Sequence, residues 1–208
     1  DCISLGKDMY HIVKAMDNIV DENLLFHALD EQRDIAQRFR NLGIGVMGIH
    51  DVLIKLGLKY GSKESLEVLD TILKDVVSRA IEVSSVLATE RGKFPEYSEK
   101  MFDSEFYKNI NFSETATELF KTRGLRNSTL LSIAPTGSIG TMLNISSGVE
   151  PWFALHYTRN TKSLGGKESS YEVWAPVVKE AMDKNWLVGK DNKLPWHFKE
   201  DLLYYKSK

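Results

Sequence analysis

The chain has 208 residues, of which 42% are hydrophobic and 27% charged, a composition typical of a globular protein with a substantial core. The formal net charge of −2 gives no overall field that would favour a nucleic acid or an anionic membrane as a partner. One cysteine, Cys2, excludes a disulfide framework within the chain and a cysteine-rich zinc site, and it favours a reducing, cytoplasmic location. No apolar run reaches the roughly 18 residues of a membrane-spanning helix, and the first residues lack the pattern of a signal peptide.

Helices are predicted to dominate the first 124 residues, chiefly because apolar residues recur at helical spacing. The predicted helices span residues 8–25, 30–41, 49–57, 62–90 and 113–124, with one short helix within the loop 94–112. Ser62 and Ser113 stand where they can cap the first turns of two of these helices, and Gly92 and Gly124 stand where they can end them.

Two short strands interrupt the helices. Residues 42–48, LGIGVMG, place apolar side chains on alternate positions, with glycines on the other face where another backbone or a ligand can come close. Residues 128–134, STLLSIA, are largely apolar, as expected of a strand that is covered on both faces. Helices that alternate with short buried strands predict a helix-rich α/β fold with parallel strands. Two strands do not form a sheet that stands alone, which predicts that the chain is part of a larger protein.

The last third of the chain is predicted to hold three more helices. A helix begins near residue 135, an extended loop follows, a second helix covers 170–185, and a turn and a final helix complete 185–208. Tyr204 and Tyr205 would point about 100° apart on that final helix, so packing explains them better than a radical or stacking pair.

Several patterns that resemble known sites are weak here. Gly43, Gly45 and Gly48 match the spacing G-x-G-x-x-G, but they lie within the predicted strand and no acidic residue ends a second strand downstream, so a dinucleotide site is not predicted. The five histidines lack the spacing of metal ligands, and His50, at the start of a helix, is expected to cap or pack. No G-x-S-x-G elbow supports a serine hydrolase.

The best candidate site is the stretch APTGSIG, residues 134–140. A strand ends at Ala134, Pro135 suits a turn, and Thr136 or Ser138 suits a helix cap, while Gly137 lets a ligand approach the backbone. A helix N-terminus with free N–H groups and two hydroxyls is suited to bind an anion such as a phosphate. The alternative is an ordinary capped turn between a strand and a helix.

Four stretches in order along the chain resemble the catalytic (large) subunit of the ribonucleotide reductases. LRNSTLLSIAPTGSIGTMLNISSGVEP resembles that family's L-R-N-S/A-T…A-P-T-G-[ST]-I-S…S-S-G-I-E-P segment. The other three stretches are AMDNIVDEN, RNLGIGVMGIHDVLIKLGLKYGSKES and LATERGKFPEYSEKMF. The wording of APTGSI and SSGVEP is most similar to the adenosylcobalamin-dependent (class II) enzymes, and the iron-dependent large subunits are the alternative.

The resemblance implies a ten-stranded α/β barrel, with residues 1–208 as one segment from the C-terminal part of the barrel domain that lacks the last strand. It implies a ribonucleoside di- or triphosphate reductase that makes deoxyribonucleotides for DNA replication by radical chemistry. The implied partners are the remainder of the catalytic subunit, a thioredoxin-like reductant and a second copy in a homo-oligomer. Carried onto this sequence, the substrate phosphates are bound by Pro135, Thr136, Gly137, Ser138 and the backbone N–H of Ile139.

The family's N-x-C-x-E motif, which holds the radical cysteine and its catalytic Asn and Glu, has no match in this sequence. No catalytic residue is therefore assigned, and the chain alone is expected to be inactive. Cys2 lacks the partner residues of that motif and is a candidate for the family's redox thiol, although the stretch between it and the DNIVDEN helix is shorter than in the family. The alternative function is a non-catalytic, nucleotide-binding or regulatory module derived from the same barrel.

Overall fold

The computed structural model describes residues 2–162 and 168–184. The chain forms two compact units, and each unit combines segments that are distant in the sequence. The first unit consists of Asp1–Gly45 and Val68–Ile133, and the second of Val46–Glu67 and Ala134–Lys208. Among the described residues, no helix has both the length and the apolar character needed to cross a membrane.

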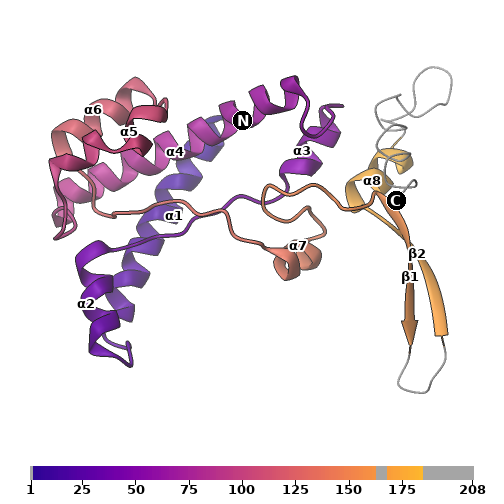
Figure 1. Cartoon of the computed structure of the whole chain (residues 1–208), viewed down its shortest axis with the longest axis horizontal. Coiled ribbons are helices and arrows are strands. Elements are labelled where there is room, and N and C mark those ends of the chain that lie inside the picture. The colour runs from indigo at the N-terminus through magenta and orange to yellow at the C-terminus, as the bar shows by residue number, and fades with distance from the viewer. Residues whose placement is uncertain (1, 163–167, 185–208) are drawn as a thin grey trace. The chain divides into compact units, whose positions relative to one another are not determined.

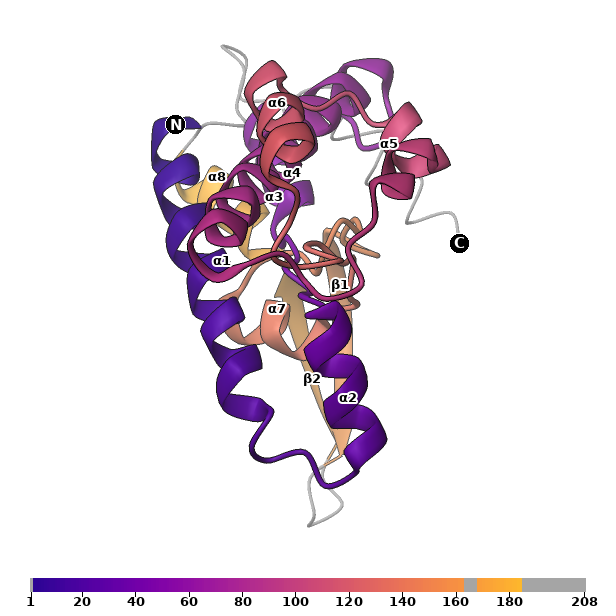
Figure 2. The ribbon, with the colours of Figure 1, turned by 90° about the vertical axis from the view of Figure 1, so that its left-hand side faces the viewer.

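The first unit is mostly helical, as predicted. Its helices are α1 (Cys2–Asn23), α2 (Asp30–Phe39), α4 (Lys63–Arg91, whose first turn belongs to the second unit), the 3-10 helix η1 (Glu99–Asp103), α5 (Glu105–Asn109) and α6 (Glu114–Arg123). Helices α1 and α2 form the two arms of a helical hairpin (Figure 2). The predicted caps are confirmed: Ser62 Oγ accepts a hydrogen bond from Ser65 N at 3.2 Å, and Ser113 Oγ accepts one from Ala116 N at 3.1 Å.

The apolar core of the first unit lies where α4 meets α6 and the loops around them (Figure 1). Its members are aromatic and aliphatic side chains that are each at most 8% exposed. They are Ile81, Phe94, Phe112, Ala116, Phe120 and Leu125. The middle and the end of the apolar stripe of α4 are buried, with Val76, Ala80 and Leu87 at most 3% exposed, whereas Leu66 near its start is 56% exposed.

The two predicted strands meet, but they form a single parallel bridge between Ile44 and Leu131 rather than a sheet. Ile44 N donates to Leu130 O at 3.0 Å and Ile44 O accepts from Ser132 N at 3.0 Å. A Cβ atom on Gly45 would lie 3.0 Å from Ser132 O, so glycine is needed where these two backbones approach. The prediction that residues 128–134 are covered on both faces is wrong for the described chain, because Ile133 is 71% exposed. Residues 128–134 pair with residues 42–45 along one edge, but no described residues bury the Ile133 side chain.

The second unit contains α3 (Ile49–Lys55), α7 (Gly137–Leu143), an antiparallel hairpin of β1 (His156–Lys162) and β2 (Glu168–Trp174), and α8 (Pro176–Asp183). The hairpin and α8 are adjacent in Figure 1. The core of the second unit combines α3, α8 and the residues before β1. The buried members are Ile54, Leu155, Ala175, Val177, Val178 and Ala181, with Trp152 and Trp174 packed against them.

The helix predicted over residues 170–185 is wrong for its first part, which is strand β2. Trp174 pairs with His156 across the hairpin, and the two rings stack with their centroids 4.0 Å apart. Such cross-strand pairing lies outside any local spacing rule, and the helix begins only at Pro176, a residue well suited to the first helical turn. The predicted final helix, with Tyr204 and Tyr205, lies outside the described residues.

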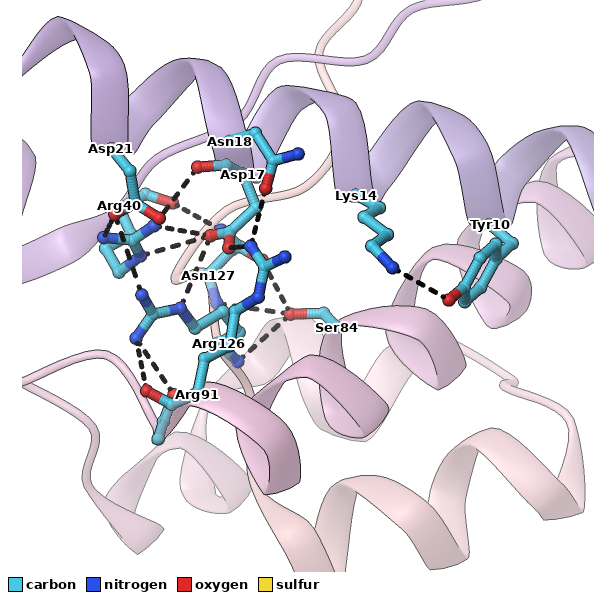
Figure 3. A network of polar contacts seen from close by, with 11 residues as sticks. Tyr10, Lys14, Asp17, Asn18, Asp21, Arg40, Ser84, Arg91, Arg126 and Asn127 are labelled. Atoms are coloured by element: carbon cyan, nitrogen blue, oxygen red, sulfur yellow. Dashed lines mark hydrogen bonds and ion pairs between the residues drawn. The ribbon is translucent and has the colours of Figure 1, made fainter.

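A buried network of charged and polar side chains joins four parts of the first unit (Figure 3). The Asp17 side chain on α1 has no exposed surface, and its Oδ1 accepts hydrogen bonds from Arg40 Nη2 at 2.7 Å and Asn127 Nδ2 at 3.0 Å. Its Oδ2 accepts one from Arg91 Nη1 at 2.9 Å, at the end of α4. Ser84 Oγ, also on α4, donates to Asn127 Oδ1 at 3.0 Å. The network therefore connects α1 to the end of α2, to α4 and to the segment after α6.

Candidate functional site

The five residues proposed from the sequence to bind phosphate lie together at the start of α7 in the second unit. Thr136 is the residue that precedes the helix, and Gly137, Ser138 and Ile139 are its first three residues. The first helical hydrogen bond runs from Gly140 N to Thr136 O at 2.8 Å, so the three preceding amides have no carbonyl partner within the helix. Pro135 is exposed beside them. The arrangement can donate several backbone hydrogen bonds to one anion.

Thr136 occupies the capping position, but its side chain makes no capping hydrogen bond to α7. Its Oγ1 accepts a hydrogen bond from Gly148 N at 2.8 Å instead. Because the hydroxyl acts as the acceptor in this contact, its proton remains able to point toward a ligand oxygen. The space around Gly137 is open, since no atom lies within 4 Å of where a Cβ would be, and Ser138 is exposed.

Helix α7 packs closely on the chain that follows it. A Cβ atom on Gly140 would lie 2.8 Å from Ser147 Oγ and 3.0 Å from Ile145 O, so the helix can approach this segment only with glycine at this position. Ile145 N also donates to Gly140 O at 3.0 Å. The position of the candidate loop is therefore tied to the position of residues 145–148.

The segment 146–152 is in turn held by the first turn of α3. Asp51 is 7% exposed, and its Oδ2 accepts from Ser146 N and its Oδ1 from Trp152 Nε1, both at 2.7 Å. His50 is 3% exposed, and its Nδ1 accepts from Trp152 N at 2.9 Å. Tyr60 lies edge-on to the His50 ring and donates its hydroxyl proton to Val149 O at 2.7 Å. The expectation that His50 caps or packs is confirmed in the form of packing.

The pKa of His50 is lowered to about 4, mainly because burial penalises the charged imidazolium, although the neighbouring Asp51 carboxylate acts in the opposite direction. The neutral ring is also what the contact with Trp152 requires, because a proton on Nδ1 would face the backbone N–H. His50 therefore serves as a neutral hydrogen-bond acceptor at neutral pH.

An apolar cavity of about 310 Å³ lies in the first unit, and none of its lining residues belongs to the candidate loop. The side chains that line it are apolar, aromatic or hydroxyl-bearing, and none is charged. They are Val77, Ile81, Met101, Ser104, Phe106, Tyr107, Phe120, Leu125, Ser128, Thr129, Leu130 and Leu131. A phosphate would lose its hydration there without gaining a charged partner, so the exposed loop at α7 is the better candidate despite its open shape.

The other site features considered from the sequence are the thiol of Cys2 and a metal centre. Cys2 begins α1, and its side chain lies outside the part of the chain that is described. Within residues 2–162 and 168–184, no group of three or more His, Cys, Asp or Glu side chains is arranged to hold a metal ion. Sequence analysis missed Asp51 and Trp152, although Asp51 lies within the GVMGIHD stretch that resembles the reductases.

The model of the family described as "Ribonucleotide reductase, barrel domain" matches residues 1–206. The chain belongs to this family. A vitamin B12-dependent ribonucleoside-diphosphate reductase of Thermoplasma acidophilum is 31% identical over 164 residues, which are 79% of this chain and 19% of that protein. An enzyme of the same name from Mycobacterium tuberculosis is 29% identical over 71% of the chain and 18% of its own length. A ribonucleoside-diphosphate reductase subunit alpha of Chlamydia pneumoniae is 28% identical over 73% of the chain and 16% of its own length.

The chain thus spans less than a fifth of the length of these curated relatives. Membership of the reductase family confirms the resemblance predicted from the four motifs. Those motifs also supply the buried network of the first unit, since Asp17, Arg40, Arg91 and Asn127 each come from a different one. Much of what makes the sequence recognisable is therefore used to hold the helices together.

Proposed function

We propose that the chain is part of the catalytic subunit of a ribonucleoside-diphosphate reductase, an enzyme that replaces the 2′-hydroxyl of a ribonucleotide with hydrogen. In this proposal residues 1–208 are the C-terminal part of a ten-stranded α/β barrel, and the exposed edge near Ile133 is covered by the rest of the subunit. A ribonucleoside diphosphate is proposed as the substrate because the relatives are named ribonucleoside-diphosphate reductases.

The residues from Pro135 to Ile139 are proposed to bind the substrate phosphates. The observation that carries this role is that three amides without a carbonyl partner within the helix and the Thr136 and Ser138 hydroxyls come from four consecutive residues, with open space at Gly137. Backbone N–H groups at the first turn of a helix favour an anion through hydrogen bonds and through the helix dipole. The loop would bind and orient the substrate, while the radical chemistry would belong to residues elsewhere in the subunit.

Adenosylcobalamin is proposed as the cofactor of the whole enzyme because two of the relatives are named as vitamin B12-dependent. When bound, this cofactor would supply the radical that begins the reaction. No described side-chain arrangement specifically fits a corrin ring, so no step is assigned to the chain's residues through it. A thioredoxin-like reductant, a homo-oligomeric assembly, a cytoplasmic location and a redox role for Cys2 remain predictions.

The test is a double substitution, Thr136→Ala with Ser138→Ala, in the complete catalytic subunit. Loss of two hydrogen bonds to a charged phosphate should raise the KM for the ribonucleotide about tenfold or more, with a smaller change in kcat. Thr122→Ala with Ser170→Ala is the control, because it removes two exposed hydroxyls distant in sequence from the loop. If the first variant keeps the KM and kcat of the unsubstituted enzyme, the loop does not bind the phosphates.

A further inference from the structure

Asp51 links two parts of the chain that the candidate loop depends on. Its two carboxylate oxygens each accept one short hydrogen bond, from Ser146 N and from Trp152 Nε1, both at 2.7 Å. Ser146 and Trp152 are six positions apart in the chain, so the Asp51 carboxylate fixes the distance between the two ends of this segment. Buried hydrogen bonds to an ionised acceptor are among the strongest in proteins, and their geometry is restrictive.

The segment between those two anchors reaches the loop directly. Gly148 lies inside the anchored stretch, adopts a positive φ of 51°, and donates its N–H to Thr136 Oγ1 at 2.8 Å. A Cβ atom on Gly148 would also lie 3.1 Å from Ala134 O, at the start of the loop. A shift of residues 146–152 would therefore change the geometry of the hydrogen bond that Thr136 Oγ1 accepts from Gly148 N.

A second contact from α3 reinforces the first. The Nδ1 atom of His50 accepts from Trp152 N, so the backbone and the indole of one residue are held by adjacent side chains. Gly48 N donates to Ser146 O at 2.8 Å, which fixes the other end of the segment. Gly48 and the first turn of α3 thus hold both ends of the segment 146–152, which contains Gly148.

We propose that Asp51 is a positioning residue for the phosphate-binding loop. By holding Ser146 and Trp152, it places the Gly148 amide against Thr136 Oγ1 and so directs the hydroxyl proton of Thr136 toward a substrate phosphate oxygen. This inference rests on the proposed function of the loop. Asp51 does not touch the substrate itself, and its effect passes through the segment 146–152.

The test uses the complete catalytic subunit with a ribonucleoside diphosphate as substrate and inorganic pyrophosphate as a competitor. Asp51→Asn keeps the size of the side chain but replaces one acceptor oxygen with an NH₂ group, which opposes one of the two N–H donors. The expected result is a rise of about tenfold in the KM for the nucleotide and a similar rise in the inhibition constant of pyrophosphate. The value of kcat should stay within about twofold, since ground-state binding is what is lost.

Trp152→Phe provides a milder second variant, because it removes the indole N–H and leaves the backbone contact with His50 in place. It should raise both constants by about threefold, the loss expected for a single hydrogen bond. Asp183→Asn, on an exposed face of α8, is the matched control and should change neither constant.

A merely structural role for Asp51 predicts a different pattern, in which the variant has less active enzyme, so that kcat falls while the KM stays the same. That pattern, or unchanged constants for both variants, overturns the inference. If Asp51→Asn does not give folded enzyme, Trp152→Phe decides. The double variant of Thr136 and Ser138 distinguishes the phosphate-binding role of the loop from the positioning role of Asp51. If the KM rises in the double variant but not in the Asp51 and Trp152 variants, only the positioning role is contradicted. An unchanged KM for the double variant contradicts the phosphate loop itself.

Discussion

Replacing Asp17 with Asn should strongly destabilise the first unit, because this carboxylate is the common acceptor of a buried network. Its side chain has no exposed surface and accepts from Arg40, Arg91 and Asn127 at 2.7–3.0 Å. Asn has a similar size, but its NH₂ group is a donor and would face guanidinium donors. The substitution therefore removes a negative charge and reverses one hydrogen bond without creating a cavity.

The expected loss of unfolding free energy depends on which negative charges remain near Arg40. Removing one partner of a buried ion pair costs about 3–5 kcal/mol, since the other charge is left without compensation. The Arg40 side chain is 4% exposed, but its Nη1 also lies 2.8 Å from Oδ1 of Asp21, whose side chain is 46% exposed. This second carboxylate retains part of the compensation, so we expect a loss near the lower end, about 3 kcal/mol of unfolding free energy.

Urea unfolding followed by far-ultraviolet circular dichroism is the appropriate assay, because urea does not screen charges and the first unit is helical. Tryptophan fluorescence would report on the wrong unit, since the four tryptophans lie between residues 152 and 196. Asp34→Asn is the matched control, because Asp34 pairs with Arg38 at the surface, with side chains 60% and 45% exposed, and should cost under about 1 kcal/mol. If the Asp17 variant unfolds at the same urea concentration as the control, the network does not stabilise the unit.

The pH dependence provides a second check on the same substitution. Burial alone would raise the pKa of Asp17, but hydrogen bonds from Arg40 and Asn127 and the charges of Arg40 and Arg126 outweigh burial and lower it. A carboxylate with a lowered pKa in the folded state contributes stability above its ordinary value of 3.8 and loses it as the pH falls through the folded value. The difference between the original chain and Asp17→Asn should be constant near neutral pH and shrink in strong acid.

Two further outcomes follow from the structure. Because the pKa of His50 falls from 6.5 to about 4 on folding, the unfolded state binds a proton that the folded state does not, so stability is full above pH 6.5 and falls by about 3 kcal/mol as the pH drops toward 4. Thermal unfolding across this range should show the slope, and its persistence in His50→Gln would contradict the assignment. Gly45→Ala should lower the unfolding free energy by about 1–3 kcal/mol, because the new Cβ would lie 3.0 Å from Ser132 O and a backbone atom cannot move away easily. Gly137→Ala is the control, because Gly137, like Gly45, has no positive φ and no atom lies within 4 Å of the added Cβ; an equal loss in both variants would refute the close-approach argument.

Local rules were sufficient for the helices. The caps at Ser62 and Ser113 act between residues within one turn of each other, so spacing alone predicts where these helices begin. The apolar stripe of α4 also predicts buried side chains such as Val76, Ala80 and Leu87, but not the 56% exposure of Leu66. The family was also predictable, because the four motifs keep their order along the chain. The start of α7 was predicted for the same reason, since Pro135 and Gly137 mark a turn into a helix.

The strands depended on distant partners and were predicted less well. Val173 and Trp174 suit either a helix or a strand, and the pairing of residues 170–174 with residues 156–160 decides for the strand. The segment 128–134 has the composition of a covered strand, yet it gains one backbone neighbour and leaves Ile133 exposed. Hydrogen bonds between strands join residues far apart in the sequence, so local periodicity does not contain them.

The sequence by itself determined most of the helices, the family and the location of the candidate phosphate loop, because each depends on residue types at short and regular spacing. Only the tertiary structure decided what the polar side chains do. It assigns the Thr136 hydroxyl to Gly148 rather than to a cap, and Asp17 to a buried network. It also joins Asp51 to Ser146 and Trp152, residues about 100 positions away. A carboxylate or hydroxyl can accept a hydrogen bond from any donor that folding brings within reach, and the chain's order does not specify which donor that is.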